Sequence, residues 1–259
     1  MISLEHIDFL YPQHPPLFKD FNWVVNEGES WAVLGPSGCG KTTLLYLLAG
    51  LHFPTHGRLL IKGQPIRQPR PQTGLILQDY GLLPWATVQQ NIQLGLRLRS
   101  FYGPDGKHSP TSFVPHQPIE AWLERLGITG IVNQYPHQLS GGQRQRTAIA
   151  RTLILQPDLL LMDEPFSSLD ALTREGLQNL TLDLWREQGF TFIIVTHAIE
   201  EAACLGQKIL VLSRPPHQSV NVVANPSLMQ PGFRASSEYQ EICQILRTRL
   251  ENSLIDEKT

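Results

Sequence analysis

In the stretch Gly35-Pro36-Ser37-Gly38-Cys39-Gly40-Lys41-Thr42, the residues fit the pattern G-x-x-x-x-G-K-[ST] of a phosphate-binding loop. Glycines let the backbone curl around a phosphate without Cβ clashes, and the N–H groups of the loop and of the helix start point at the anion. The lysine of this pattern adds a point charge at the β- and γ-phosphates, and the threonine offers a hydroxyl to Mg²⁺. The loop, with Thr43 after it, is therefore predicted to bind a nucleotide.

The residues on either side of this loop supply the strand and the helix that the motif requires. Residues 30–34 are predicted to form a short buried strand. After the loop, apolar side chains share one face at helical spacing, namely Leu44, Leu45, Leu48 and Leu51. An incidental glycine turn beside a lysine would not need this context.

Composition limits the class of protein. A chain of 259 residues with 41% hydrophobic and 17% charged residues is predicted to be one large α/β domain, or a core with an inserted subdomain. The net charge of −2 provides no basic field, so no nucleic-acid partner is expected. The three cysteines indicate no disulfide framework and a reducing compartment. No apolar run approaches the roughly 18 residues of a membrane span, so any membrane role would depend on a partner.

Strands and helices alternate along most of the chain, which predicts a mainly parallel sheet wrapped by helices. A small antiparallel sheet is expected before the loop and again after the first helix, from residues 2–11, 21–25 and 58–61. Further strands are predicted at 74–77, 159–162, 191–195 and 209–212. Further helices are predicted from Val88 to Leu96, at 119–127, from Gln143 to about Leu155, at 171–188, at 199–205 and at 239–250. Residues 100–118 read as a long surface loop, rich in Pro, Gly, Ser and His.

Two carboxylates end the apolar strand at 159–162. Asp163 and Glu164 are adjacent, and adjacent side chains on an extended strand diverge, so they are expected to face different partners. Asp163 suits Mg²⁺ held through water, together with Thr42. Glu164 suits the water that attacks the γ-phosphate, as general base. The alternative is a pair of acidic caps before Pro165.

Two more polar residues follow predicted strands. His197 lies after the strand at 191–195, where open α/β sheets place ligands, and could hydrogen-bond the γ-phosphate and orient the water. Gln78 follows the strand at 74–77 in the same way. Taken alone, each would be an ordinary structural or loop residue, and the neighbouring phosphate site makes them candidates.

The segment Leu139-Ser140-Gly141-Gly142-Gln143 begins a predicted helix. A second anion site is physically reasonable at such a helix start, whereas a plain N-cap is the ordinary interpretation of Ser-Gly-Gly. The order of motifs resembles that of ABC transporter nucleotide-binding subunits over residues 2–214. The motifs are the phosphate-binding loop, Gln78, this pentapeptide, Asp163-Glu164, Ser168-Leu169-Asp170 and His197.

The resemblance implies a fold and roles for individual residues. The fold is α/β, a P-loop NTPase core with a mainly parallel sheet, an N-terminal antiparallel β-subdomain and a helical subdomain inserted at about residues 79–155. Tyr11 would stack on adenine, with a core aromatic as the alternative. Gln78 would lie near Mg²⁺ and the attacking water. Asp170 would cross a dimer interface.

The resemblance also implies an assembly. Ser140, Gly141, Gly142 and Gln143 would complete the nucleotide site of a second subunit, so two chains would dimerise head to tail around two ATP molecules. The ATPase domain would span residues 1–214, and residues 215–259 would form a short tail with a helix. Opening and closing of the dimer would drive a membrane partner.

A narrower resemblance to nitrate, sulfonate and taurine importer ATPases, a group whose relatives also carry pyrimidine precursors, rests on residues 78–88 and 163–174. It implies a bacterial importer with a separate transmembrane permease, a periplasmic or lipid-anchored solute-binding protein, and a place at the cytoplasmic face of the membrane. The segment 100–118 is longer than that group's usual connection. Cys39 replaces a serine common in the loop, and a thiol beside Lys41 and a helix start is expected to be reactive.

Two alternatives remain open at this stage. The chain could be a soluble ABC ATPase that acts on a partner outside transport, or a binding module whose nucleotide site has decayed. Leu83-Pro84-Trp85 favours docking to a membrane-protein helix, although a packed turn would also explain it. The presence of Glu164 and His197 argues against decay.

Overall fold

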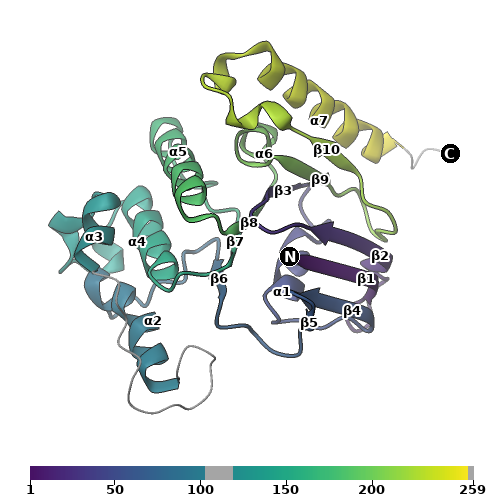
Figure 1. The fold of residues 1–259 in the computed structure, drawn as a ribbon. Helices are drawn as coiled ribbons and strands as arrows, with labels where there is room; N and C mark the ends of the chain where they lie inside the picture. Colours follow the sequence, from purple (N-terminus) through teal and green to yellow (C-terminus); the bar gives the residue numbers. More distant parts are fainter. Residues whose placement is uncertain (103–118, 256–259) are drawn as a thin grey trace. The chain divides into compact units, whose positions relative to one another are not determined.

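The computed structural model describes residues 1–102 and 119–255 and separates the chain into two units (Figure 1). Unit 1 consists of Met1–Pro69 and Gly189–Thr259, and unit 2 consists of Arg70–Gln188. None of the helices in the described residues is long and apolar enough to cross a membrane.

The antiparallel sheet of unit 1 has the strand order β2-β1-β4-β5. Its strands are β1 (Ile2–Phe9), β2 (Phe18–Val25), β4 (His56–Ile61) and β5 (Gln64–Pro65). Apolar side chains alternate along β1, and a register shift between Leu4 and Ile7 lets both ends of the strand face the core. The predicted antiparallel sheet on both sides of the first helix is confirmed.

The second set of strands in unit 1 has the order β10-β9-β3-β8. β3 (Ser30–Leu34) pairs in parallel with both β8 (Thr191–Thr196) and β9 (Lys208–Val211). Every residue of β3 and β8 is buried, as is typical of a parallel sheet covered on both faces. The sequence did not predict β10 (Val222–Ala224), a three-residue strand antiparallel to β9.

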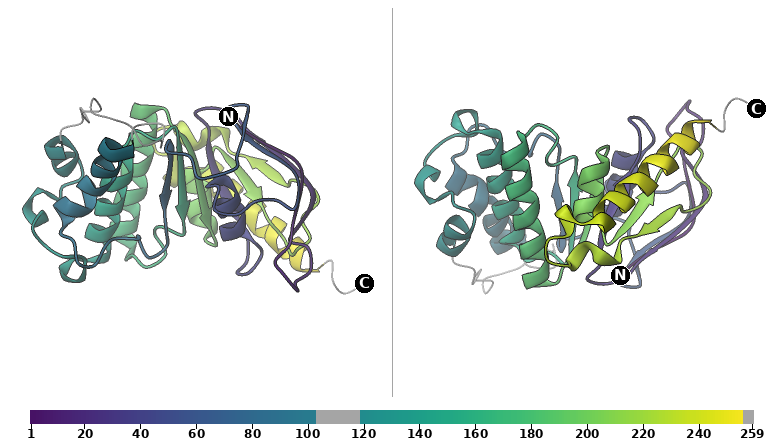
Figure 2. Two further views of the ribbon diagram at one scale, coloured as in Figure 1. Left: turned by 90° about the horizontal axis from the view of Figure 1, so that it is seen from below. Right: turned by 90° about the horizontal axis from the view of Figure 1, so that it is seen from above.

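The described part of unit 1 contains three α-helices: α1 (Lys41–Leu48), α6 (Ile199–Leu205) and α7 (Ser237–Ile255). α6 contacts β3 and β8, and α7 contacts α6 and β9. Figure 2 shows α7, in yellow, lying over the C-terminal part of unit 1. The short 3₁₀ helices η3 (Pro226–Met229) and η4 (Phe233–Ala235) lead into α7. The tail is thus part of unit 1, through the pairing of β10 with β9 and the packing of α7 on α6 and β9.

The first helix is shorter than its leucine pattern suggests. Gly50, with a φ of 72°, ends α1, and the N–H groups of Gly50 and Leu51 donate to the carbonyls of Leu47 and Tyr46 at 3.0 and 2.9 Å. This is the Schellman arrangement of a glycine-terminated helix. Leu51 therefore lies beyond the helix and is 49% exposed, so its predicted place on the buried face was wrong.

Unit 2 pairs β6 (Thr73–Ile76) in parallel with β7 (Leu159–Asp163). The chain between them carries α2 (Val88–Tyr102), α3 (Ile119–Arg125), η1 (Thr129–Ile131), η2 (Pro136–Gln138) and α4 (Gly141–Leu153), and α5 (Ala171–Gln188) follows β7. α4 is the central helix, because it contacts α2, α5 and β6. Since α2 continues to Tyr102, the predicted loop does not begin at Ser100, and the rest of it, residues 103–118, lies outside the described residues.

Candidate functional site

The predicted phosphate-binding loop connects β3 to α1 and depends on glycine at two positions. Gly38 and Gly40 have φ values of 79° and 100°, in the left-handed region that residues with a Cβ rarely adopt. A Cβ on Gly40 would also lie 2.9 Å from both Cδ atoms of Leu17, which precedes β2. These glycines let the chain curl back over the first turn of α1.

Lys41 lies inside this curl and is only 5% exposed. Its ammonium group donates to the backbone carbonyls of Gly35 and Pro36, both at 2.9 Å. The loop therefore holds a positive charge at its centre, where the first N–H groups of α1 also converge. This arrangement suits the phosphates of a nucleotide.

Tyr11 lies beside the first turn of α1. Its hydroxyl is 3.0 Å from Oγ1 of Thr43, and its ring meets the rings of Phe9 and His52 edge-on, with centroids 5.0 and 5.8 Å away. The side chain is 37% exposed, so it is not a core aromatic. The hydroxyl of Thr43 is engaged with Tyr11, and stacking of the Tyr11 ring on a base stays a prediction.

Cys39 contradicts the expectation of a reactive thiol. Its side chain is buried, and this burial raises the pKa of the thiol, although the charge of Lys41 lowers it. Desolvation of the thiolate outweighs the nearby cation. The backbone carbonyl of Cys39 accepts a hydrogen bond from Nε2 of His217 at 2.7 Å, a contact that the sequence did not predict.

His197 lies at the same edge of the unit 1 strands as the loop. Leu34, at the end of β3, pairs with Thr196, at the end of β8. Gly35 follows β3 and His197 follows β8, and the His197 side chain is exposed. The predicted placement of His197 at a carboxyl strand end is confirmed, and it brings the imidazole and the loop to one edge of unit 1.

In unit 2, Asp163 is the last residue of β7 and is buried. Glu164 is not part of the strand: its φ of 43° lies in the left-handed region. The predicted reason for the divergence of the two carboxylates, an extended backbone, was therefore wrong. The amide and hydroxyl of Ser167 donate to the Glu164 carbonyl at 3.3 and 3.0 Å and hold this turn. Such strained positions cluster at functional sites.

Gln78 follows β6 and is exposed at the carboxyl end of the pair that β6 forms with β7. Next to it, Tyr80 has a φ of 68°, and its hydroxyl lies 2.8 Å from Oγ of Ser168. Arg151 of α4 donates to the carbonyls of Gly81 and Tyr80 at 2.6 and 3.1 Å. Tyr80 and Arg151 thus fix the segment after Gln78, a role that the sequence did not predict for either residue.

The start of α4 is capped by its own side chains. The Oγ atom of Ser140 accepts from the amide of Gln143 at 3.2 Å, and Oε1 of Gln143 accepts from the amide of Ser140 at 2.9 Å. This reciprocal pair is a capping box. The N-cap interpretation is confirmed, and the proposed contact with a second subunit's nucleotide stays a prediction.

Both glycines of the pentapeptide approach neighbouring side chains closely. A Cβ on Gly141 would lie 2.9 Å from Cδ2 of Leu169, and one on Gly142 would lie 2.6 Å from Cγ2 of Thr173. The carboxylate of Asp170 accepts from the amide of Thr173 at 3.0 Å, and this backbone hydrogen bond lowers the pKa of Asp170. Glycine therefore lets the start of α4 pack against the turn that leads into α5.

We expect Gly142→Ala to lower the free energy of unfolding by about 1–3 kcal/mol, because the new methyl group overpacks this contact. Thr173→Ser removes Cγ2 and should restore most of the loss in the double variant. Gly176→Ala in α5 is the matched control, since nothing lies within 4 Å of its Cβ position. Urea unfolding of the four proteins tests this, and wild-type stability of Gly142→Ala would contradict the packing argument.

Each unit carries an oxygen donor of the kind that Mg²⁺ prefers. No group of three or more His, Cys, Asp or Glu side chains that could hold a metal occurs in residues 1–102 and 119–255. Mg²⁺ is usually held by one or two carboxylates or hydroxyls, waters and substrate phosphates. The Thr42 hydroxyl at the start of α1 and the Asp163 carboxylate are donors of that kind.

Comparison with known proteins agrees with this geometry. The family model described as ABC transporter matches residues 18–167. The taurine import ATP-binding protein TauB of Pelagibacter ubique is 44% identical over 79% of this chain and 75% of its own. The aliphatic sulfonates import ATP-binding protein SsuB of Bacillus cereus is 38% identical over 87% of this chain and 85% of its own.

Solved structures show the same fold. The protein cbiO1 of Clostridium perfringens, part of the ABC transporter complex cbiONQ, has a TM-score of 0.73 at 25% identity, over 99% of this chain and 98% of its own. A dimeric ATP-binding cassette in a post-hydrolysis state, bound to ADP and phosphate, has a TM-score of 0.71 at 28% identity, over 87% of this chain and 99% of its own. The chain therefore belongs to the ABC transporter family and is an ATP-binding ATPase whose sequence groups with the subunits of taurine and sulfonate importers.

Proposed function

We propose that this chain is the ATP-hydrolysing subunit of a bacterial importer. It binds and hydrolyses MgATP at a head-to-tail dimer interface and so drives uptake of a small solute through a separate transmembrane permease. The observation that carries the proposal is the Lys41 ammonium held inside a glycine loop. The similarity to import subunits over most of the chain supports the transport role.

In this proposal, the residues of the loop bind the phosphates. The backbone N–H groups of residues 35–43, apart from Pro36, which has none, bind phosphate oxygens together with the Lys41 ammonium, and Tyr11 stacks on adenine. The Thr42 hydroxyl and, through water, the Asp163 carboxylate would hold Mg²⁺, with Gln78 nearby. When bound, Mg²⁺ would neutralise charge that develops on the phosphate oxygens.

Hydrolysis in this proposal depends on two polar side chains that follow buried strands. Glu164 accepts the proton of the attacking water as general base, and His197 hydrogen-bonds the γ-phosphate. The strained backbone of Glu164 supports this role, because strain of that kind persists where a side chain must be aimed.

The second copy of the chain supplies the remaining contacts. We infer that Ser140, Gly141, Gly142 and Gln143 meet the nucleotide bound by the partner copy, and that Asp170 crosses between the copies. The dimeric cassette with ADP and phosphate supports this arrangement. The exposed side chains of Ser140 and Asp170 are consistent with it.

The permease would dock on the turn after Gln78. Trp85 is 73% exposed, while the turn beneath it is rigid: the amide of Leu83 donates to Oδ1 of the buried Asn91 at 2.8 Å, and Nδ2 of Asn91 donates to the Ala86 carbonyl at 2.9 Å. A packed turn that still presents an indole ring to solvent suits a docking surface. The protein would then lie at the cytoplasmic face of the membrane, with a periplasmic or lipid-anchored solute-binding protein on the other side.

We expect the tagged chain to bring down a polytopic membrane protein from detergent-solubilised native membranes, with ATPase activity in the eluate. Trp85→Ala should reduce recovery of that protein by about tenfold or more, since exposed aromatic anchors contribute 2 kcal/mol or more. Phe53→Ala, an exposed aromatic of unit 1, is the control. Recovery of soluble proteins alone, with ATPase activity intact, would favour a soluble ABC ATPase that acts outside transport.

We propose a chemical class for the transported solute. The named relatives import taurine and aliphatic sulfonates. A small anion of the sulfonate or nitrate kind, or a pyrimidine precursor, would be selected by the permease and the solute-binding protein. Identifying the membrane protein in the eluate narrows this choice.

A further inference from the structure

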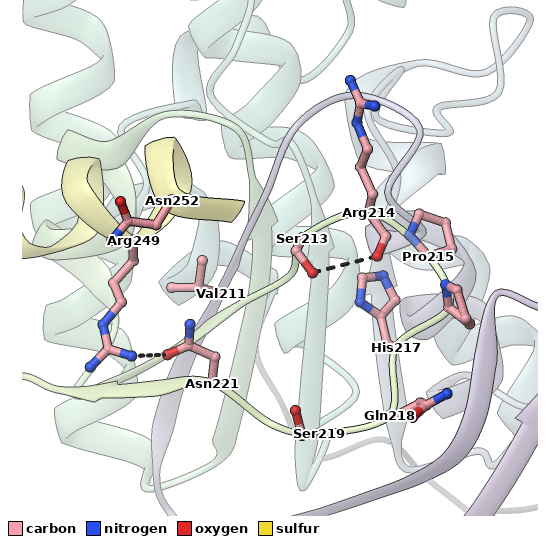
Figure 3. A pocket seen from close by; sticks show the side chains of 11 residues that line it. Val211, Ser213, Arg214, Pro215, His217, Gln218, Ser219, Asn221, Arg249 and Asn252 are labelled. Carbon is pink, nitrogen blue, oxygen red and sulfur yellow. Dashed lines mark hydrogen bonds between the residues drawn. The ribbon is translucent and has the colours of Figure 1, made fainter. Parts of the chain in front are cut away.

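A cavity of about 610 Å³ opens in unit 1 between the segment that follows β9 and the end of α7 (Figure 3). Its lining includes residues of 211–221 together with Arg249 and Asn252 of α7. None of these lining residues belongs to the phosphate-binding loop or to the other residues assigned above to ATP binding and hydrolysis.

The lining has the chemistry of an anion site. Nη1 of Arg249 donates to Oδ1 of Asn221 at 3.0 Å, and the Asn252 amide lies on the same side of the cavity in Figure 3. Ser213 and Ser219 add hydroxyls, and no Asp or Glu stands among the described residues that line it. Arg214 also lines the cavity, but its guanidinium points away from Arg249. One guanidinium with amide and hydroxyl donors suits a small molecule with a single oxyanion group.

One lining residue of this cavity is hydrogen-bonded to the phosphate-binding loop. His217 lines the cavity, is 4% exposed, and donates from Nε2 to the Cys39 carbonyl at 2.7 Å. Burial lowers the pKa of His217, which keeps the imidazole neutral with its one N–H in this bond. At the start of the loop, a Cβ added to Gly35 would lie 2.6 Å from the carbonyl oxygen of Leu212, so the two backbones are in close contact. Residues 212–217 therefore contact both ends of the loop's glycine-rich part.

We propose that this cavity binds a small organic anion through Arg249 and that the bound anion changes the nucleotide affinity of the loop through residues 212–217. A ligand that shifts this segment must alter the contacts of Gly35 and Cys39, because the loop packs directly on it. Coupling of two sites is reciprocal, so nucleotide must change the affinity for the anion by the same factor.

The first experiment measures binding of trifluoromethanesulfonate to the full-length protein by ¹⁹F NMR, with saturating MgADP present so that the phosphate-binding loop is filled. We expect Arg249→Gln to weaken binding by about tenfold or more, the size expected for loss of a charge-assisted hydrogen bond. Arg247→Gln, on the same helix but outside the lining, should bind as the wild type does. Equal binding by the two variants, or no binding by the wild type, overturns the proposal.

The second experiment repeats the titration without nucleotide. We expect the Kd of the probe to change by about fivefold or more between the two conditions, within the usual range of coupling between sites. The Kd of MgADP should shift by the same factor when the probe is saturating. A probe that binds through Arg249 with the same Kd in both conditions would overturn the coupling. Trifluoroacetate, titrated in parallel, distinguishes a carboxylate from a sulfonate ligand.

Discussion

Glu164→Gln is expected to bind ATP with the wild-type Kd and to hydrolyse it about 10²–10⁴-fold more slowly. The variant loses a general base, whose contribution is of that size, and keeps the loop of residues 35–43. Fluorescent-nucleotide titration measures the Kd, and phosphate release measures the rate. Glu241→Gln on the exposed side of α7 is the control for removal of one carboxylate.

A second substitution separates the backbone strain of this position from its chemistry. Glu164→Gly should be as inactive as Glu164→Gln and yet more stable to unfolding, by about 1 kcal/mol, since a φ of 43° costs glycine nothing. If Glu164→Gln turns over at nearly the wild-type rate, the assignment of the base is wrong, whatever the stability of the glycine variant.

Lys41→Met should instead weaken nucleotide binding. The ammonium is buried and held at 2.9 Å from the carbonyls of Gly35 and Pro36, so no other described cation in the loop can replace it. Loss of a charge-assisted contact to phosphate costs about 1.5–3 kcal/mol, or roughly 10- to 150-fold in Kd. Titration with ATP measures this change directly.

The matched control for Lys41→Met is Lys62→Met. Lys62 lies on the surface of unit 1, 3.1 Å from Glu27, and such exposed ion pairs contribute little. Its Kd for ATP should equal that of the wild type. Binding of ATP by Lys41→Met within threefold of the wild type would show that the loop amides alone hold the phosphates.

Much of the fold follows from local sequence patterns. Continuous apolar runs predicted the buried strands β3, β7 and β8, because only a strand covered on both faces tolerates such a run. The bounds of α5 and α6 agree with the prediction, since helical periodicity and flanking breakers mark both ends. The glycine loop and the polar residues after each strand could also be predicted, because their chemistry depends on residue type and spacing.

The features that were missed or wrongly predicted share a cause. In each, the interaction that determines the structure is made by residues distant in sequence or by the backbone. β10 has three residues and exists because β9 offers it a partner. Cys39 has the neighbours of a reactive thiol, and burial reverses the expected direction of its pKa. Glu164 leaves the strand in a left-handed turn that no pattern of side chains encodes.

The sequence by itself determined the family, the phosphate-binding loop, and the candidate residues that follow each buried strand, because these depend on residue types at fixed spacing. Only the tertiary structure decided that the tail is part of unit 1, that His217 is hydrogen-bonded to the loop, and that Arg249 and Asn221 share a cavity. Those contacts join residues 28 to 178 positions apart, and their existence depends on how the strands pair and how side chains are buried, which local patterns do not specify.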